Sequence, residues 1–222
     1  MTRRPIIAID GPAGAGKTTA ARNLAERLGL VYLDTGATFR AIALKALREN
    51  IDLSDEAALT ALAQSSDIRF ASDRLERILL DGEDVSDAIR AQAVANASSA
   101  VAVHPAVRAR LVELWRKIGE NGGVVLEGRD IGTVVFPDAE IKFFLDARPE
   151  ERAKRRFTEQ SVQEDITIEQ VTQDLEVRDN ADRTRQHAPL RRAEDAIEVD
   201  TTHLTPEQTL NRLLEEARKH LN

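Results

Sequence analysis

The sequence contains no cysteine, few histidines and no long hydrophobic run, and each absence removes a class of function. Without cysteine, disulfide bonds, thiol catalysis and cysteine-ligated metal sites are excluded. No stretch approaches the roughly 20 apolar residues that span a bilayer, and the apolar run at 6–9 stops too early, at Asp10 and Gly11, for a signal peptide. We therefore expect a cytoplasmic protein that does not bind membranes. The histidines lack metal-ligand spacing and are expected on the surface: His104, His187, His203 and His220.

Acidic residues outnumber basic ones, and the formal net charge is −7. This balance argues against a nucleic-acid polymer or an anionic membrane as partner, since neither would be attracted to the chain as a whole. Any anion site must then be a local cluster of arginine and lysine. A length of 222 residues with 42% hydrophobic content is ample for one sizeable core and short for two independent ones. We predict a single domain over 1–222, expected to be a monomer.

The most informative motif is the glycine-rich segment at 11–18, which has the form GxxxxGK(S/T) of a phosphate-binding loop. Its glycines let successive backbone N–H groups converge on phosphates. Lys17 would add a charge at the β- and γ-phosphates, and Thr18 would offer its hydroxyl to Mg²⁺. An apolar strand precedes the loop and a helical pattern over 17–28 follows it, as the motif requires. The predicted ATP-binding residues are Gly11, Pro12, Ala13, Gly14, Ala15, Gly16, Lys17, Thr18 and Thr19.

Short apolar strands alternate with longer helical patterns along the chain. The predicted strands are 5–10, 31–34, 124–127, 141–146 and 196–200. Alternation of this kind predicts an α/β fold, a five-stranded parallel sheet flanked by helices, whose ligands bind beyond the carboxyl ends of the strands. A last helix begins with capping-box spacing at Thr205 and Gln208. Its predicted buried stripe is Leu210, Leu213, Leu214, Ala217 and Leu221.

One region, about 66–90, breaks the alternation. Two short apolar runs and an Asp81-Gly82 turn predict a small antiparallel sheet inserted into the parallel core. The pattern leaves two interpretations open, a surface decoration and a mobile substrate-binding lobe.

A predicted helix that begins near Pro149 is rich in arginine. Arg148, Arg152, Arg155 and Arg156 fall on one face at helical spacing. They can form a lid over phosphates that supplies charge to the transition state, or a solvated face neutralised by Glu150 and Glu151. We place the lid at about 148–164.

Further arginines follow the predicted strands and helices at positions suited to a second phosphate. Arg129 and Asp130 come directly after the strand at 124–127, where a guanidinium beside a carboxylate can serve a phosphate and a base. Arg40 follows the strand at 31–34. Arg178, Asp182 and Arg185 form a helical row, which in isolation is often only a set of surface ion pairs.

Five segments taken together carry a family resemblance: GPAGAGKTT, LDTGATFRAIAL, VANASSAVAVHPAVR, LEGRDIGTVVFPDA and RDNADRTRQHAPL. They resemble the bacterial cytidylate kinases, and the resemblance covers almost the whole chain. It implies a P-loop nucleoside monophosphate kinase that transfers the γ-phosphate of MgATP to CMP or dCMP. It also implies that the antiparallel insertion belongs to a monophosphate-binding lobe at about 37–90.

The resemblance further implies roles for individual residues. Thr35 matches a residue at the cytosine edge, Phe39 stands where the family usually has tyrosine, and a helical wheel over 107–118 does not choose between Arg108 and Arg110. The implied CMP-binding residues are Thr35, Arg40, Ser99, Arg108, Arg129, Asp130, Arg178, Asp182 and Arg185. Catalytic charge is expected from Lys17, Arg129, Arg152, Arg155 and Arg156, together with Mg²⁺ bound at Thr18.

Other NTP-binding classes fit the sequence less well. A regulatory GTPase needs DxxG and N/TKxD motifs, and neither occurs. An ATP-driven motor needs an apolar strand that ends in Asp-Glu, whereas Ala147 follows Asp146. The nearer alternative is another small-molecule kinase that acts on UMP or on a non-nucleotide acceptor.

Overall fold

The computed structural model describes residues 4–71, 77–160 and 166–221, and the chain divides into two compact units. The first unit holds residues 1–30 and 122–222, and the second holds 31–121. The predicted lobe lies in the second unit and the predicted lid in the first. Residues 72–76 of that lobe and 161–164 of that lid are outside the described residues. The single-domain organisation and these boundaries stay predictions.

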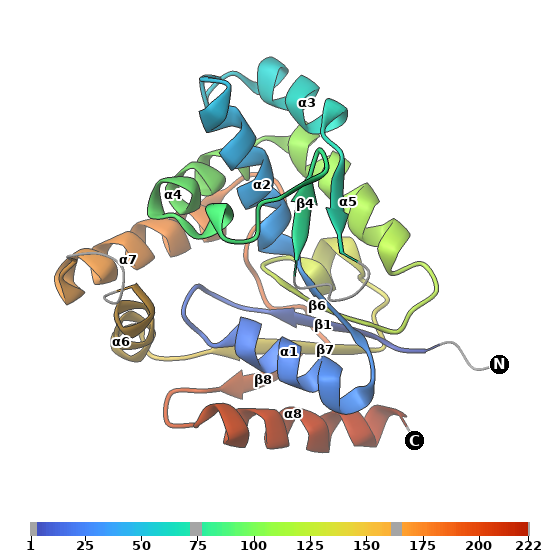
Figure 1. Cartoon of the computed structure of the whole chain (residues 1–222). Helices are drawn as coiled ribbons and strands as arrows, with labels where there is room; N and C mark the ends of the chain where they lie inside the picture. Colours follow the sequence, from blue (N-terminus) through green and yellow to red (C-terminus); the bar gives the residue numbers. More distant parts are fainter. Residues whose placement is uncertain (1–3, 72–76, 161–165, 222) are drawn as a thin grey trace. The chain divides into compact units, whose positions relative to one another are not determined.

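The sheet has the strand order β2-β6-β1-β7-β8, and the last four of these strands belong to the first unit (Figure 1). In that unit β1 (Ile6–Asp10) lies between β6 (Val124–Gly128) and β7 (Ile141–Asp146), and β7 pairs with β8 (Ile197–Asp200), all in parallel. Every residue of β1 is buried, as expected for a central parallel strand. The register places Asp10 opposite Gly128, so the segments after β1 and β6 leave the sheet at the same edge.

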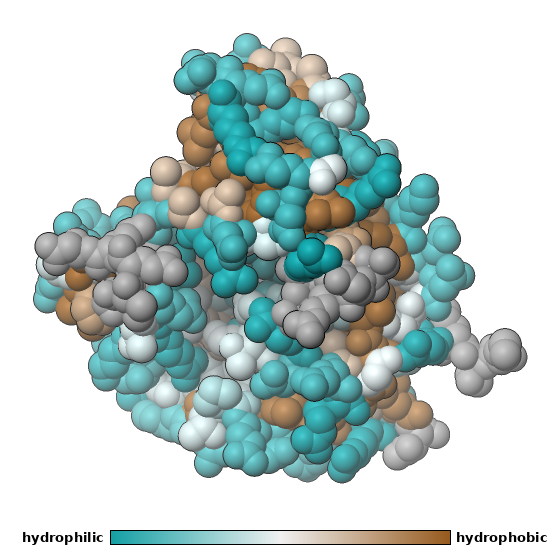
Figure 2. All heavy atoms as spheres, viewed as in Figure 1, coloured by the Kyte–Doolittle hydropathy of each residue, from teal (hydrophilic) through white to brown (hydrophobic). Residues whose placement is uncertain are grey.

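Two amphipathic helices of the first unit pack against each other, α1 (Lys17–Leu28) and α8 (Pro206–Leu221). Gly29 is the C-cap residue of α1 and has the left-handed conformation, with φ 63°. Thr205 and Gln208 form the expected capping-box bonds at the start of α8. The outer face along α8 is mostly hydrophilic (Figure 2). The predicted stripe is buried except at Leu221, which is 39% exposed because the helix ends there.

Three further elements of the first unit carry or flank the site. A single π-turn, η2 (Ile131–Val135), follows β6 directly. Helix α6 (Pro149–Gln160) follows β7, and α7 (Ile168–Thr184) packs beside it. Both helices lie near the loop between β1 and α1 (Figure 1).

The second unit is largely helical. It begins with β2 (Val31–Asp34) and contains α2 (Thr35–Arg48), α3 (Glu56–Ser65), the short η1 (Ala88–Arg90), α4 (Gln92–Val101) and α5 (Pro105–Ile118). Its antiparallel sheet consists of β3 (Ile68–Phe70), β4 (Ile78–Leu80) and β5 (Glu83–Asp84). Asp81 and Gly82 both have positive φ, as a two-residue hairpin turn requires.

These observations confirm the predicted fold: a parallel five-stranded sheet flanked by helices, with a small antiparallel sheet inserted. The predicted surface position of His104 is wrong. This residue is buried, and its Nε2 lies 2.8 Å from the Leu53 carbonyl oxygen. Within the described residues, none of the helices has the length and apolar character needed to cross a bilayer.

Candidate active site

The phosphate-binding loop lies in the first unit, between β1 and α1, and its backbone leaves no room for side chains at two positions. A Cβ at Gly11 would lie 2.0 Å from the Leu145 carbonyl oxygen, and φ there is +149°. A Cβ at Gly14 would lie 2.9 Å from the Arg152 carbonyl oxygen. At the start of α1, Gly16 offers no side chain to cap the helix. The N-cap residue therefore does not compete for the first N–H groups of α1, which can bind an anion.

Lys17 is the buried cation of this loop. Its side chain is 5% exposed, and its Nζ donates to the Pro12 carbonyl oxygen at 2.6 Å. Burial and the nearby charges of Arg129 and Arg178 lower the pKa of Lys17 to about 7, although Glu127 and Asp182 oppose this. An anionic phosphate would relieve the repulsion among these cations. Arg129 and Arg178 thus act electrostatically on the same place as the phosphate-binding loop.

Arg129 is held by a carboxylate from α7. Its Nε donates to Asp182 Oδ2 at 2.8 Å, and Arg185 donates to the other oxygen of Asp182 at 3.2 Å. Arg185 also forms an ion pair with Asp130 at 3.5 Å. Burial alone would raise the pKa of Asp182, but the surrounding cations Arg129, Arg178 and Arg185 outweigh it and hold that pKa below its usual value. The structure therefore brings together the first-unit members of the predicted acceptor set.

Asp10, which the sequence analysis passed over, organises the turn that follows Arg129 and Asp130. Its carboxylate accepts hydrogen bonds from the N–H groups of Ile131 at 2.8 Å and Gly132 at 2.7 Å. Burial raises the pKa of Asp10 to about 6, while these two bonds lower it less than burial raises it. The side chain links the end of β1, where the phosphate-binding loop starts, to η2. Its only sequence signal is an acid at the end of a buried apolar strand.

The four arginines at the start of the predicted lid do not form one uniform stripe. Arg152 is 6% exposed and forms a buried ion pair with Asp179 of α7. Arg155 is half-buried and donates to the Thr201 hydroxyl at 3.0 Å, whereas Arg156 pairs with Glu159 at 3.2 Å. The Arg148 side chain is exposed. The lid interpretation for these residues stays a prediction, but their surroundings differ from one another.

The remaining predicted acceptor residues lie in the second unit. Thr35 is buried at the first position of α2, and Asp34 caps that helix by accepting from the Ala37 N–H at 3.0 Å. The Arg40 guanidinium donates to Asp34 at 2.6 Å and is about one quarter exposed. The half-buried Ser99 lies on α4. Their assignment to the acceptor stays a prediction.

Arg108 is distinguished from Arg110 by its burial, which the helical wheel over 107–118 does not resolve. Arg108 is 5% exposed, whereas Arg110 is half-buried. The Arg108 guanidinium carbon lies 5.3 Å from the centre of the Phe39 ring, and that ring meets Trp115 edge-on at 5.7 Å. Phe39 therefore packs between a cation and an indole, a role that needs its ring and not a hydroxyl.

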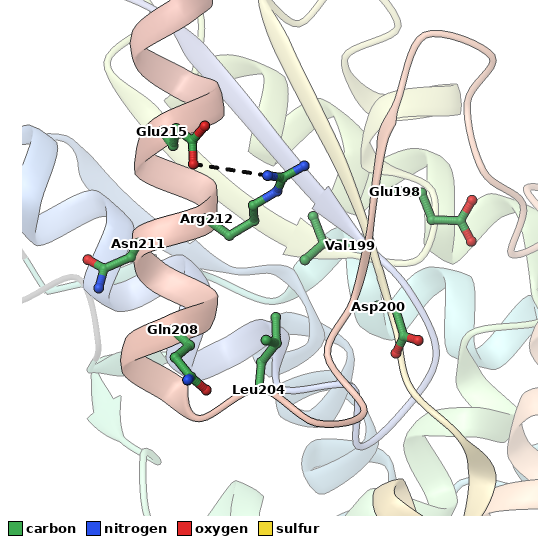
Figure 3. A pocket seen from close by; sticks show the side chains of 8 residues that line it. All are labelled: Glu198, Val199, Asp200, Leu204, Gln208, Asn211, Arg212 and Glu215. Carbon is green, nitrogen blue, oxygen red and sulfur yellow. Dashed lines mark ion pairs between the residues drawn. The ribbon is translucent and has the colours of Figure 1, made fainter.

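A groove elsewhere in the first unit has the wrong charge for nucleotide phosphates. It lies between β8 and α8 (Figure 3) and is lined by Glu198, Val199, Asp200, Leu204, Gln208, Asn211, Arg212 and Glu215. Its one arginine, Arg212, is shared by Glu215 at 4.0 Å and Glu216 at 3.3 Å. A phosphate would meet an excess of carboxylates there. The candidate active site is therefore at the phosphate-binding loop.

Comparison with known proteins decides the family. The family model described as cytidylate kinase matches residues 7–219. The chain belongs to the cytidylate kinase family. It is 51% identical over 217 residues to the cytidylate kinase of Syntrophotalea carbinolica (strain DSM 2380 / NBRC 103641 / GraBd1), covering 97% of this chain and 92% of that protein. It is 48% identical over 217 residues to the cytidylate kinase of Geobacillus kaustophilus (strain HTA426), covering 97% of each.

Membership of the cytidylate kinase family makes the chain a nucleoside monophosphate kinase, an ATP-dependent phosphotransferase. Among solved structures, shikimate kinase from Bacteroides thetaiotaomicron shares the fold with a TM-score of 0.50, at 13% identity over 96% of this chain and 98% of that one. That likeness shows the P-loop kinase fold alone.

Proposed function

We propose that the enzyme transfers the γ-phosphate of MgATP to CMP or dCMP and releases ADP with CDP or dCDP. An oxygen of the acceptor phosphate attacks the γ-phosphorus, and the bond from that phosphorus to the β,γ-bridging oxygen breaks. The protein has little covalent work in such a transfer. Its task is to align the two phosphates, neutralise their charge and exclude water.

The observation that carries this proposal is the crowding of cations around Lys17. Burial and the positive charges of Arg129 and Arg178 act on Lys17 together and lower its pKa to about 7. The carboxylates of Glu127 and Asp182 offset part of this repulsion, and bound phosphate anions would offset more of it. Two phosphate groups, one from the donor and one from the acceptor, would supply them.

On the donor side, residues 11–19 would hold the triphosphate through backbone N–H groups and Lys17. Thr18 is exposed at the start of α1, and its hydroxyl is the hard oxygen ligand that Mg²⁺ prefers. When bound, Mg²⁺ neutralises charge on the β- and γ-phosphates. The α6 residues Arg152, Arg155 and Arg156 would add charge near the transferred group, with lid closure excluding water.

On the acceptor side, the family resemblance supports roles that the contacts make chemically reasonable. Arg40 and Arg129 would bind the CMP phosphate, which would compete for them with Asp34 and Asp182. Ser99, Arg178 and Asp182 would bind the pentose. The base would be read by Thr35, Arg108, Asp130 and Arg185.

We also propose that the enzyme works as a cytoplasmic monomer. The absence of cysteine and the net charge of −7 suit a reducing compartment and a protein that does not bind nucleic-acid polymers or membranes.

The test is an ADP-release assay with MgATP and a panel of acceptors: CMP, dCMP, UMP, AMP and small hydroxylated metabolites. We expect CMP and dCMP to be the best acceptors. Lys17→Met should remove most turnover without unfolding the protein, whereas Lys219→Met, at an exposed lysine of α8, should keep it. Activity confined to a non-cytidine acceptor would overturn the proposed substrate, and near-normal turnover by Lys17→Met would overturn the role of the loop.

A further inference from the structure

Both backbone polar groups of Ala13, in the middle of the phosphate-binding loop, are bound by one buried ion pair. The Ala13 N–H donates to Asp179 Oδ1 at 3.2 Å, and the Ala13 carbonyl oxygen accepts from the Arg152 guanidinium at 3.0 Å. Asp179 comes from α7 and Arg152 from α6. The loop is therefore tied at one residue to two helices that follow it by more than a hundred positions.

The ion pair itself is almost inaccessible to water. Asp179 is 4% exposed and Arg152 is 6% exposed. The Arg152 guanidinium donates to Asp179 Oδ2 and, through Nε, to the Ala147 carbonyl oxygen at 3.0 Å. If Asp179 lost its charge, Arg152 would be a buried cation without its counter-ion, which is strongly unfavourable. Asp179 thus supplies the counter-charge that keeps the Arg152 side chain beside the Ala13 and Ala147 carbonyl oxygens.

Packing around the pair transmits this position to the loop. Ala13 is buried in a small apolar cluster with Ala153, Val171 and Leu175, against which Phe157 and Ile166 pack. At Gly14 an added Cβ would meet the backbone of Arg152, with its Cα at 3.2 Å. With so little free space, a displacement of α6 or α7 must displace the loop as well.

Helix α7 carries a second contact one turn further on. Asp182 lies three positions after Asp179, and its Oδ2 lies 2.8 Å from Arg129 Nε. One rigid helix therefore holds the donor loop through Asp179 and an acceptor arginine through Asp182.

We infer that Asp179 is a positioning residue for phosphate transfer: acting through Arg152 and Ala13, it holds the phosphate-binding loop in its nucleotide-binding conformation. This inference rests on the proposed function only in taking that loop as the ATP site. Asp179 touches neither substrate in this mechanism. Its effect is on the donor side, because its two partners are a loop residue and the side chain that braces the loop.

The experiment measures ADP binding by calorimetry in the full chain without any acceptor. ADP lacks the γ-phosphate, so a direct contact from Arg152 to that group would not be measured. Asp179→Asn can still accept from the Ala13 N–H but removes the charge that holds Arg152. We expect it to weaken ADP binding about ten-fold, as the loss of a charged hydrogen bond predicts, and to weaken CMP binding much less. The exposed Asp174 of α7 provides the control Asp174→Asn, which should bind ADP normally.

A double-mutant cycle separates positioning from general damage. Arg152→Met should weaken ADP binding by a similar factor. The double variant should bind ADP about as tightly as the single variant with the lower affinity, because both substitutions remove the same link. Additive losses, an unchanged ADP affinity in folded Asp179→Asn, or equal losses for ADP and CMP would overturn the inference. If Asp179→Asn does not fold, Arg152→Lys is measured instead, since lysine keeps the charge but cannot reach all three partners. Normal ADP binding by Arg152→Lys would equally overturn it.

A failure of the proposed substrate would be distinguishable. A wild-type chain that binds ADP but does not phosphorylate CMP would refute the proposed function and leave the assignment of Asp179 standing.

Discussion

Replacing Asp10 by asparagine should change how the stability of the protein depends on pH. The carboxylate of Asp10 is buried between the phosphate-binding strand and η2, and its pKa is raised from 3.8 to about 6. Between these two values the folded protein keeps a proton that the unfolded chain has lost. The contribution of Asp10 to stability is therefore greatest below pH 3.8 and is lost as the pH rises through 6.

The size of the effect follows from the two pKa values. A difference of about two units corresponds to about 3 kcal/mol between the acidic and neutral limits. Between pH 7 and pH 5 the change is about 1.3 kcal/mol. Asparagine does not titrate, so the variant lacks this contribution. It keeps one acceptor for the N–H groups of Ile131 and Gly132 and leaves the other N–H facing an amide, which costs about 1–3 kcal/mol.

The assay is urea unfolding followed by circular dichroism at pH 5, 6, 7 and 8, for the wild type, Asp10→Asn and the exposed control Asp174→Asn. The free energy of unfolding of the wild type minus that of Asp10→Asn should grow by about 1.3 kcal/mol from pH 7 to pH 5. The corresponding difference for Asp174→Asn should change little. A difference for Asp10→Asn that is flat, or that shrinks on acidification, would refute the argument that burial governs this carboxyl group.

Two further predictions concern the phosphate-binding loop. The pKa of Lys17 is about 7 without phosphates and should rise when they bind, so MgATP binding at pH 8 should take up close to one proton and should weaken as the pH rises. Calorimetry in buffers of different ionisation enthalpy measures this proton uptake, and an equal uptake by Lys17→Met would contradict the prediction. Gly11→Ala places a Cβ 2.0 Å from the Leu145 carbonyl oxygen and should lower the free energy of unfolding by about 3 kcal/mol or more. Thermal unfolding measures this loss, and a melting temperature equal to that of the wild type would contradict it by showing that the strand end can shift. Gly82→Ala, where no atom lies within 4 Å of the added Cβ, is the control for the positive φ.

Local patterns in the sequence were sufficient to predict much of the fold. The motif at 11–18 needs a strand before it and a helix after it, and β1 and α1 have those positions. The hairpin at Asp81 and Gly82 follows from turn chemistry that neighbouring residues alone provide. Such features depend on residues a few positions apart, so a single sequence contains their cause.

The arginine helix illustrates where local patterns stop being sufficient. Helical spacing places Arg148, Arg152, Arg155 and Arg156 on one face, yet Arg152 is buried and Arg148 is exposed. The difference arises because Asp179 lies opposite Arg152, and that proximity depends on how α6 and α7 pack. Periodicity describes the face of one helix and says nothing about its neighbour.

The sequence by itself determined that this protein has a phosphate-binding loop, a parallel sheet around it and the residues of a nucleotide kinase. The tertiary structure decided which of those charged residues hold one another: Asp10 with the turn at Ile131 and Gly132, Asp182 with Arg129, and Asp179 with Arg152 and Ala13. The partners in each set are far apart in the chain. Their contacts exist because parallel strands end at the same edge of the sheet and because α7 packs back on that edge. Burial of the whole core produces this arrangement, and a local pattern in the sequence does not.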